Sequence, residues 1–422
     1  MSLRKLTFVA LLWAFALNAS LPTASAAERR EPFELRDGDR VVLLGGTFFE
    51  RAQRYGYLET ALQLRFPDRK FSVRNLGWSA DTVFAESRGI FDAPEKGYAR
   101  MIEQVKGLKP TVIFLHYGGN EAFNGEAYLD TFVKQYEKLL DDLAPTDAEM
   151  VLVAPLPLWQ MPSPLPDVSS ANAKRQIFSA AVQKLAARRS LKFVDVSTQL
   201  SQDAVPRWGK VFNRPLTEDG VTLNAGGYRF ASDVFCRALT GEFDSSSGHL
   251  ALKKASPGVA LDRSKPVPTL TISSIPDGQR IAATLEFELA AVPRGSVGIA
   301  FSSDVAFGRY ELVVDGKTQI DFDYKANGGH RGGPSLIPAA YVTTALREAT
   351  IDKNQMYFHR WRPQNVTYLF LFRKHEQGNN AKEVEEFEQI VAKLDDRIFE
   401  LKQKATEVTV EIVRVGDVEA GQ

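Results

Sequence analysis

The sequence predicts an α/β domain with a parallel sheet, followed by a β-rich region and a returning helical segment. Between residues 40 and 240, short apolar runs alternate with stretches of helical periodicity. Short apolar strands separated by helices are typical of a parallel sheet covered on both faces. After about residue 250, strand-like runs follow one another directly, and a last helix and strand end the sequence. A chain of 422 residues is long enough for two domains.

Five apolar runs are expected to form the parallel sheet, at residues 40–46, 71–77, 111–119, 149–155 and 192–197. Ligands bind beyond the carboxyl ends of the strands in such sheets. The first three runs end in glycine-rich polar segments, Gly45-Gly46-Thr47, Asn75-Leu76-Gly77 and Tyr117-Gly118-Gly119-Asn120. The sequence therefore predicts a site at this edge of the sheet.

The C-terminal part divides into residues 249–345, predicted to be β-rich, and residues 346–422, predicted to pack on the preceding domains. Strand-like runs and a hairpin signal at Asp315-Gly316 indicate the β-rich region. The later segment contains EVEEFEQIVAKLDDRIFELKQ, whose apolar stripe is typical of a helix that packs on a core rather than binding a cofactor. A final strand, TEVTVEIVRV, follows it.

Residues 1–26 are predicted to be a secretory signal peptide. They combine the basic start MSLRK, the apolar run LTFVALLWAFAL and small residues before Ala26 and Ala27. The alternative is an uncleaved membrane anchor, but the apolar run is shorter than the ~20 residues that a span needs. No later segment is apolar enough to cross a bilayer. We therefore expect a secreted or periplasmic protein without a membrane span after cleavage.

Composition excludes several other classes of function. The 52 basic residues balance 52 acidic ones, whereas a nucleic-acid binder shows a basic excess or stripe. The single cysteine, Cys236, lies in a helical pattern and is expected to be a buried structural thiol rather than a nucleophile. No metal-spaced cluster of cysteine and histidine is present, so we expect no metal and no cofactor.

Four motifs follow one another in residues 40–240: Gly45-Gly46-Thr47, Gly77, Gly118-Gly119-Asn120, and Asp219-Gly220-Val221-Thr222. Together they resemble the conserved blocks of the SGNH (GDSL-like) hydrolases, secreted esterases with a flavodoxin-like three-layer fold. Longer segments, QRYGYLETAL, NLGWSADTVFAESR, YGGNEAF and WRPQNVTYLFLFRKHEQGNN, resemble secreted planctomycete-type SGNH proteins. The resemblance implies an SGNH domain over residues 30–248.

The resemblance also implies a carbohydrate acyl-ester hydrolase, with a small-molecule or polysaccharide ester as its substrate. It assigns Thr47 to the nucleophile position, Asp219 to the acid that orients the base, and Thr222 to the histidine position. The backbone N–H groups of Thr47 and Gly77 and the side-chain amide of Asn120 would form the oxyanion hole. Such donors stabilise the charge that develops on the substrate oxygen.

Two of these positions depart from the family pattern. Threonine can serve as a nucleophile in place of serine, although the methyl group of Thr47 crowds the attack. Thr222 is the more serious change, because a hydroxyl group cannot accept a proton at neutral pH. Loss of the base costs about 10⁶ in turnover in a serine protease. We therefore expect a degenerate site with weak or no esterase activity, in which Asp219 caps the following helix or has no role.

Two alternatives remain open. The protein is an active esterase if another histidine supplies the base, and the candidates are His116, His359 and His375. For His116, a buried hydrogen-bonded side chain is the other interpretation, while His249 and His330 are expected to be solvated. Alternatively, the pocket binds a saccharide without turnover.

Further polar and aromatic residues have both a structural and a functional interpretation. Trp78 and Trp159 either pack in the fold or stack on a sugar. Glu121 is expected to make a supporting hydrogen bond, and Asp81 to cap a helix. The donor-rich segments FHRWRPQN and FRKHEQGNN either hold the C-terminal region against the first domain or form a polar wall for a hydroxylated ligand.

Overall fold

The computed structural model describes residues 33–201, 216–241, 250–264, 268–275, 280–287, 296–314, 316–324, 337–338, 344–377, 381–403 and 406–417. The predicted signal peptide, residues 1–26, lies outside this part of the chain, as do His249 and His330. Within the described residues, no helix combines the length and the apolar composition that crossing a membrane requires.

The N-terminal domain contains a five-stranded parallel sheet in the order β2-β1-β3-β4-β5. Its strands are β1 (Arg40–Gly45), β2 (Ser72–Asn75), β3 (Val112–His116), β4 (Glu149–Val153) and β5 (Lys192–Val194). The central strands β3 and β4 are buried at every position. This burial explains their continuous apolar runs, because both faces of a parallel sheet are covered. The predicted α/β class is confirmed.

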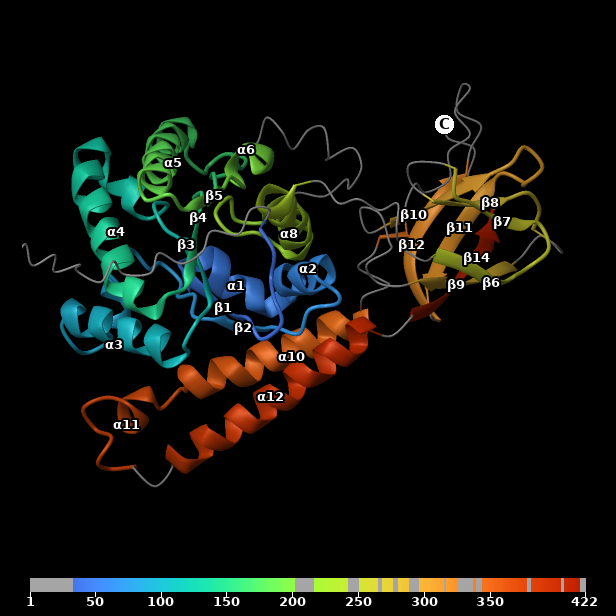
Figure 1. Ribbon diagram of the computed structural model, residues 1–422. Helices are drawn as coiled ribbons and strands as arrows, with labels where there is room; N and C mark the ends of the chain where they lie inside the picture. Colours follow the sequence, from blue (N-terminus) through green and yellow to red (C-terminus); the bar gives the residue numbers. More distant parts are fainter. Residues whose placement is uncertain are drawn as a thin grey trace, which may run out of the picture.

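Helices cover both faces of the sheet and make a three-layer domain (Figure 1). One face packs on α1 (Thr47–Tyr55), α2 (Tyr57–Arg65) and α8 (Ala225–Thr240). The other face packs on α3 (Pro94–Gly107), α4 (Leu129–Leu143) and α5 (Ser169–Arg188). The short helices are η1 (Glu86–Arg88), η2 (Glu121–Asn124), η3 (Glu126–Tyr128), η4 (Ala144–Thr146) and α6 (Ser197–Leu200).

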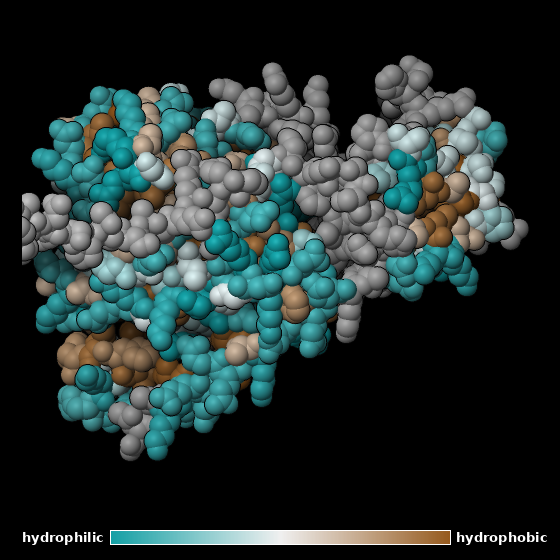
Figure 2. Space-filling view, viewed as in Figure 1, coloured by the Kyte–Doolittle hydropathy of each residue, from teal (hydrophilic) through white to brown (hydrophobic). Residues whose placement is uncertain are grey.

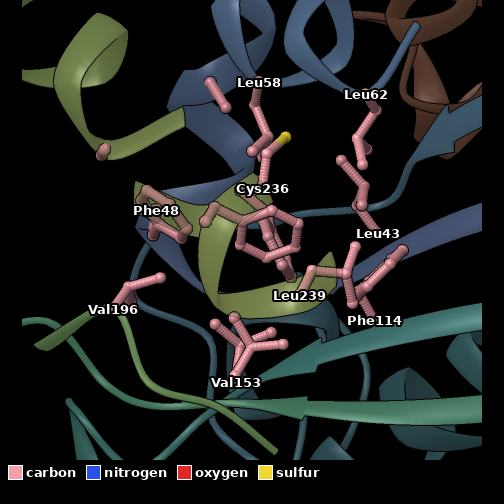
Figure 3. Packing of buried hydrophobic residues seen from close by; sticks show 14 of the residues in the cluster. Leu43, Phe48, Leu58, Leu62, Phe114, Val153, Val196, Cys236 and Leu239 are labelled. Atoms are coloured by element: carbon pink, nitrogen blue, oxygen red, sulfur yellow. The ribbon is translucent and has the colours of Figure 1, made fainter. Parts of the chain in front are cut away.

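The alternation of side chains along the strands contributes apolar residues to a hydrophobic core on each face of the sheet. Val41 and Leu43 of β1 face one layer of helices, while Val42 and Leu44 face the other. Figure 3 shows the first core, in which Cys236 of α8 lies among apolar side chains. Burial raises the pKa of its thiol to about 12, which suits a structural role and opposes a nucleophilic one.

The β-rich region contains two further sheets, in the orders β13-β10-β8-β7 and β12-β11-β14-β9-β6. Their strands are β6 (Leu250–Ala255), β7 (Val259–Asp262), β8 (Thr269–Ile272), β9 (Arg280–Phe287), β10 (Ser296–Phe301), β11 (Gly308–Val314), β12 (Lys317–Tyr324), β13 (Ile337–Pro338) and β14 (Thr406–Gly416). Pairing is antiparallel except between β8 and β10. β14 lies between β9 and β11, so the last strand of the sequence forms the middle of its sheet.

Two long helices, α10 (Thr344–Trp361) and α12 (Ala381–Gln403), run side by side along the α/β domain, with the short α11 (Val366–Leu369) between them in sequence (Figure 1). We call this pair the helical hairpin. α10 packs against α1, α2 and β2. Figure 2 shows a mostly polar surface over the α/β domain, with an apolar area around the place of α11. Phe370 and Phe372 follow α11 in the sequence and are exposed.

Candidate functional site

A cavity of about 70 Å³ opens at the carboxyl ends of β1 and β3. A parallel sheet is expected to place its site at this edge. Three of the predicted site residues line the cavity: Thr47 at the start of α1, Asn120 after β3, and Thr222 in the loop before α8. His116, the last residue of β3, also lines it.

Thr47 is the first residue of α1, directly after the turn at Gly46 that joins β1 to the helix. Its hydroxyl oxygen accepts a hydrogen bond from the backbone N–H of Ala80 at 3.1 Å. Ala80 has a φ of 61°, in the left-handed region, which is uncommon for a residue other than glycine. The loop after β2 therefore holds the Thr47 hydroxyl against the cavity wall.

The structure places the two other predicted oxyanion donors differently. The Asn120 amide donates one hydrogen bond to the carbonyl of Asp81 at 2.9 Å and lines the cavity. An amide has two N–H donors, so one remains for a ligand. Gly77 does not line the cavity, and its N–H donates to the Asn75 side chain at 2.8 Å. A side chain at Gly77 would lie 2.3 Å from the backbone nitrogen of Glu50, so the residue is required for close packing on α1.

Asp219 and Thr222 form a closed hydrogen-bonded loop. The Thr222 hydroxyl donates to Asp219 Oδ2 at 2.6 Å, and Oδ1 accepts the N–H groups of Thr222 and Val221 at 2.6 and 2.8 Å. Partial burial raises the pKa of Asp219, but these bonds and one from Thr217 outweigh it and lower the pKa to about 2. The expectation that Asp219 caps the next helix is wrong, because Asn224 caps α8 by accepting the N–H of Gly227.

Arg51 completes this loop and was missed by the sequence analysis. Its Nη1 donates to the Thr222 hydroxyl oxygen at 3.3 Å. Arg51 lies four residues after Thr47 on α1, and residues at this spacing share one face of a helix. This spacing of four residues is the sequence signal that could have identified Arg51. It places a guanidinium beside Thr222.

His116 is buried as expected, with 8% of its surface exposed, but it is not hydrogen-bonded as one interpretation required. Neither ring nitrogen has a hydrogen-bond partner among the described residues. The ring packs against Phe48 and Phe49, at 5.0 and 5.6 Å between centroids. Burial, with a further contribution from the charge of Arg175, lowers the pKa of His116 to about 3. The imidazole is therefore neutral at pH 7 and a weak base.

The other two candidate bases lie away from the cavity. His359 is in α10, where its ring contacts Phe358 at 5.8 Å between centroids. His375 is 74% exposed and lies 3.7 Å from Glu376. Neither lines the cavity. No histidine nitrogen in the described residues makes a hydrogen bond to the Thr47 hydroxyl.

Two buried acids support the cavity wall. Glu121 accepts the N–H groups of Val83 and Gly118, both at 2.9 Å, which is the supporting role expected of it. Burial raises the pKa of Glu121 to about 7. Asp81 pairs with the Arg88 guanidinium at 2.7 Å in the interior. The expected helix-capping role of Asp81 is wrong, because Ala85 is the N-cap of the following helix η1 and no side chain caps it.

Arg175 of α5 was also missed by the sequence analysis. Its guanidinium lines the cavity, donates to the carbonyl of Leu156 at 3.0 Å, and lies 4.9 Å from the ring centroid of Phe123. Burial lowers its pKa to about 10, which keeps it charged at neutral pH. Its place at the cavity depends on the packing of α5, which local sequence pattern does not report.

The two tryptophans serve packing. Trp159 is buried, and its indole N–H donates to the carbonyl of Leu200 at 2.9 Å. Trp78 contacts the hairpin, with the Arg362 guanidinium 3.4 Å from its ring centroid and Trp361 at 5.9 Å. The donor-rich segments make internal contacts as well, including Arg360 with Glu388, Arg373 with Glu376 and Tyr368, and Asn365 with Gln377.

No group of three or more His, Cys, Asp or Glu side chains in the described ranges is arranged to hold a metal ion. The cavity offers a threonine hydroxyl, the Asn120 amide and the Arg175 guanidinium at the end of a parallel sheet. The same part of the chain also matches a known family.

Residues 27–230 match the GDSL-like Lipase/Acylhydrolase family. This GDSL-like domain contains the whole parallel sheet and every residue of the cavity. The β-rich region and the helical hairpin lie beyond the matched residues. No curated protein matches the sequence.

Solved structures similar to the chain include a gut microbial diltiazem-metabolizing enzyme. It is 13% identical, with a TM-score of 0.53, over 90% of this chain and 99% of that one. This likeness shows a shared fold that continues beyond the GDSL-like domain. An acetyl xylan esterase, AlAXEase, is 20% identical over 46% of this chain and 96% of that one, with a TM-score of 0.36. An acetylxylan esterase from Geobacillus stearothermophilus is 18% identical over 49% and 96%, with a TM-score of 0.37.

Proposed function

We propose that this protein is an exported GDSL-like hydrolase-family protein of the carbohydrate acyl-ester type, with a degenerate catalytic site and weak or no esterase activity. The family match and the cavity at the sheet edge support the hydrolase ancestry. Export is inferred from the signal-like residues 1–26. The carbohydrate ester follows from the resemblance of the sequence to secreted SGNH proteins.

The hydrogen bond from Thr222 to Asp219 carries this proposal. Ester hydrolysis by a hydroxyl nucleophile needs a base that removes its proton and an acid that orients the base. Here the acid holds a threonine, which has no basic nitrogen to offer. Asp219 itself is a poor base, since its pKa is about 2. The Thr47 hydroxyl therefore stays protonated at neutral pH.

The remaining machinery supports binding better than turnover. Asn120 and the amino end of α1 still face the cavity and can donate to a substrate oxygen. Gly77 gives its N–H to Asn75 instead. Loss of one oxyanion donor typically costs about 10²–10³ in rate. Binding and the remaining donors together leave about 10³–10⁴ over water when the triad is absent.

Restoring the base tests the proposal. Thr222→His, alone and with Thr47→Ser, is expected to raise kcat/KM for p-nitrophenyl acetate and acetylated xylo-oligosaccharides, with the larger gain in the double variant. Asp219 would accept the new imidazole N–H in place of the Thr222 hydroxyl. A wild-type kcat/KM within the usual enzyme range of about 10⁴–10⁸ M⁻¹s⁻¹ would contradict the proposal.

The chain provides a matched control for this substitution. Thr198 donates to Asp195 Oδ2 at 2.7 Å, and its N–H donates to Oδ1 at 3.3 Å, in the same Asp-x-x-Thr arrangement outside the cavity. Thr198→His therefore introduces a histidine into an equivalent loop without placing it near Thr47. It is expected to leave the rate at the wild-type level, and an equal gain in this variant would show that the effect of Thr222→His is not local.

The rival function is an esterase with a relocated base, and one observation favours His116 for this role, because it lines the cavity. Its low pKa and the lack of a carboxylate partner make it a weak base. The variants are compared with the wild-type protein by any slow hydrolysis of p-nitrophenyl acetate that it shows above background. We expect this rate to be unchanged in His116→Ala, His359→Ala and His375→Ala. Loss of a measurable wild-type rate in one of these variants would establish the relocated base.

A further inference from the structure

A second cavity opens at the opposite edge of the parallel sheet, where the strands begin. It is lined by Arg40 at the start of β1, by Lys106 and Lys109 at the turn between α3 and β3, and by Asp147 before β4. Two prolines and two threonines complete the lining, and none of these residues lines the cavity at Thr47. We call this second cavity the amino-edge groove. Its volume of about 470 Å³ lies within the range of about 300–1,000 Å³ that is typical of small-ligand sites.

Three cationic side chains line the amino-edge groove without a carboxylate partner. Arg40, Lys106 and Lys109 form no ion pair with any described residue. Elsewhere on the same domain an exposed cation can be paired, as Arg188 is with Glu137 at 2.6 Å. A groove lined by charges of one sign concentrates the electric field and raises the local concentration of counter-ions. The groove therefore favours an anion.

The acids near the groove leave this positive charge in excess. Asp147 is the one acid among the described residues that line it. Asp39 is buried, and it accepts hydrogen bonds at 2.6 and 2.7 Å from a backbone N–H and from a threonine hydroxyl of the groove wall. Asp142 acts on Lys106 through its charge, but its carboxylate is held by Lys138 at 2.5 Å. Three lining cations therefore face one lining carboxylate.

Backbone carbonyls, rather than an acid, hold the Arg40 side chain in place. Its Nε donates to the carbonyl of Lys109 at 2.5 Å, and its Nη1 donates to the carbonyl of Gly38 at 3.5 Å. A guanidinium has five N–H donors, so three remain for a ligand, two of them at Nη2. Lys109 is fixed as well, because its N–H donates to the carbonyl of Lys106 at 3.0 Å. The guanidinium is thus oriented before any ligand binds.

We propose that the amino-edge groove binds an anion with at least two negative charges, held by the Arg40 guanidinium and the ammonium groups of Lys106 and Lys109. A guanidinium binds an oxyanion through a planar fork of donors, and an ammonium binds it as a point charge. One water occupies about 10–15 Å³ of such a volume, so about 470 Å³ holds a ligand of many atoms. Two sources of this chemistry are a small phosphoanion, which is independent of the proposed function, and an acidic sugar chain, which extends it.

Isothermal titration of the full-length mature protein at pH 7 and low salt tests the proposal. The probes are sodium pyrophosphate, with sodium chloride at equal ionic strength as its control, and trigalacturonate, with its uncharged triamide as its control. At least one of the two anions is expected to bind saturably with a Kd at or below about 1 mM. The affinity is expected to fall as salt is added, because a Debye length of about 10 Å at 0.1 M screens exposed charges.

The two probes distinguish the sources of the anion. Binding of pyrophosphate alone supports a phosphoanion, and binding of trigalacturonate alone, in preference to its triamide, supports an acidic sugar chain. Binding of both anions supports a groove that recognises charge in either form. Saturable binding of neither anion overturns the proposal. The readout involves neither Thr47 nor hydrolysis, so it can fail while the proposed loss of turnover holds, and the reverse is equally distinguishable.

A double variant, Lys106→Gln with Lys109→Gln, locates the binding. Both side chains are exposed, and glutamine at position 109 keeps the carbonyl that holds Arg40. The affinity for the preferred anion is expected to fall at least about tenfold, because two charge-assisted contacts are lost.

The control removes the same charge from another part of the same domain. Lys134→Gln with Lys184→Gln changes exposed lysines of α4 and α5 that do not line the groove. This variant is expected to bind the anion like the wild-type protein. Unchanged affinity in the variant of Lys106 and Lys109, or an equal loss in the control, would show that the anion does not bind at the groove and would contradict the proposal.

Discussion

Asp219 has a structural role in the loop before α8. Four donors reach its carboxylate: two backbone N–H groups and the hydroxyls of Thr217 and Thr222. The Thr222 hydroxyl also accepts from Arg51. This local network holds the loop before α8 at the cavity.

The lowered pKa of Asp219 gives a stability prediction. A carboxyl with a pKa of about 2 in the folded state and 3.8 in the unfolded chain stabilises the fold above pH 3.8. That contribution is lost as the pH falls from 3.8 towards 2. Asp219→Asn, which does not titrate, is expected to show a smaller loss of stability over this range. Urea unfolding of both proteins between pH 4 and 2 measures it, and parallel pH profiles would contradict the prediction.

At the residue scale, sequence pattern predicted the residues that belong to strand ends. Thr47 and Asn120 lie at one cavity because the carboxyl ends of parallel strands share an edge, and Thr222 reaches the same cavity from the loop before α8. The pattern did not predict that Gly77 gives its N–H to Asn75, or that Arg175 lies beside His116. Those contacts depend on how loops and a distant helix pack, which periodicity does not encode.

At the element scale, ion pairs attach the helical hairpin to the α/β domain, and these pairs differ widely in how much of their side chains is buried. Lys353 of α10 is fully buried and donates to Glu59 of α2 at 2.7 Å and to the carbonyl of Val73 at 2.9 Å. Lys70 pairs with Asp396 of α12 at 2.8 Å, with both side chains more than half exposed.

The two lysines provide a matched test of this attachment. Lys353→Met leaves Glu59 buried without its counter-charge, and breaking a buried pair in this way costs about 3–5 kcal/mol. Lys70→Met breaks an exposed pair across the same interface and is expected to change stability little. The free energy of unfolding in urea measures both. Similar losses in the two variants would show that burial does not determine the strength of this attachment.

The apolar stripe of the last long helix predicted that it packs, and Val391 and Ile398 are indeed buried while Ile390 stays 43% exposed. The sequence did not predict which surface receives it. Buried pairs such as Lys353 with Glu59 join positions almost three hundred residues apart, and such distant partners leave no local pattern.

At the scale of the whole molecule, the chain passes from the GDSL-like domain into the β-rich region and then returns. α10 packs on the α/β domain, and β14 afterwards lies between β9 and β11 in the C-terminal sheet. The final segment therefore contributes to both parts. Alternating apolar residues predicted a last strand, but its central place in the sheet follows from pairing between distant strands.

We propose that Thr47 is not activated as a nucleophile, and a covalent probe tests this most directly. An activated hydroxyl attacks the phosphorus of diethyl p-nitrophenyl phosphate and releases p-nitrophenolate, which leaves a diethylphosphoryl group on the protein. Intact-mass spectrometry is expected to show no label on the wild-type protein and one label on the Thr47→Ser, Thr222→His double variant. Stoichiometric labelling of wild-type Thr47 would contradict the account.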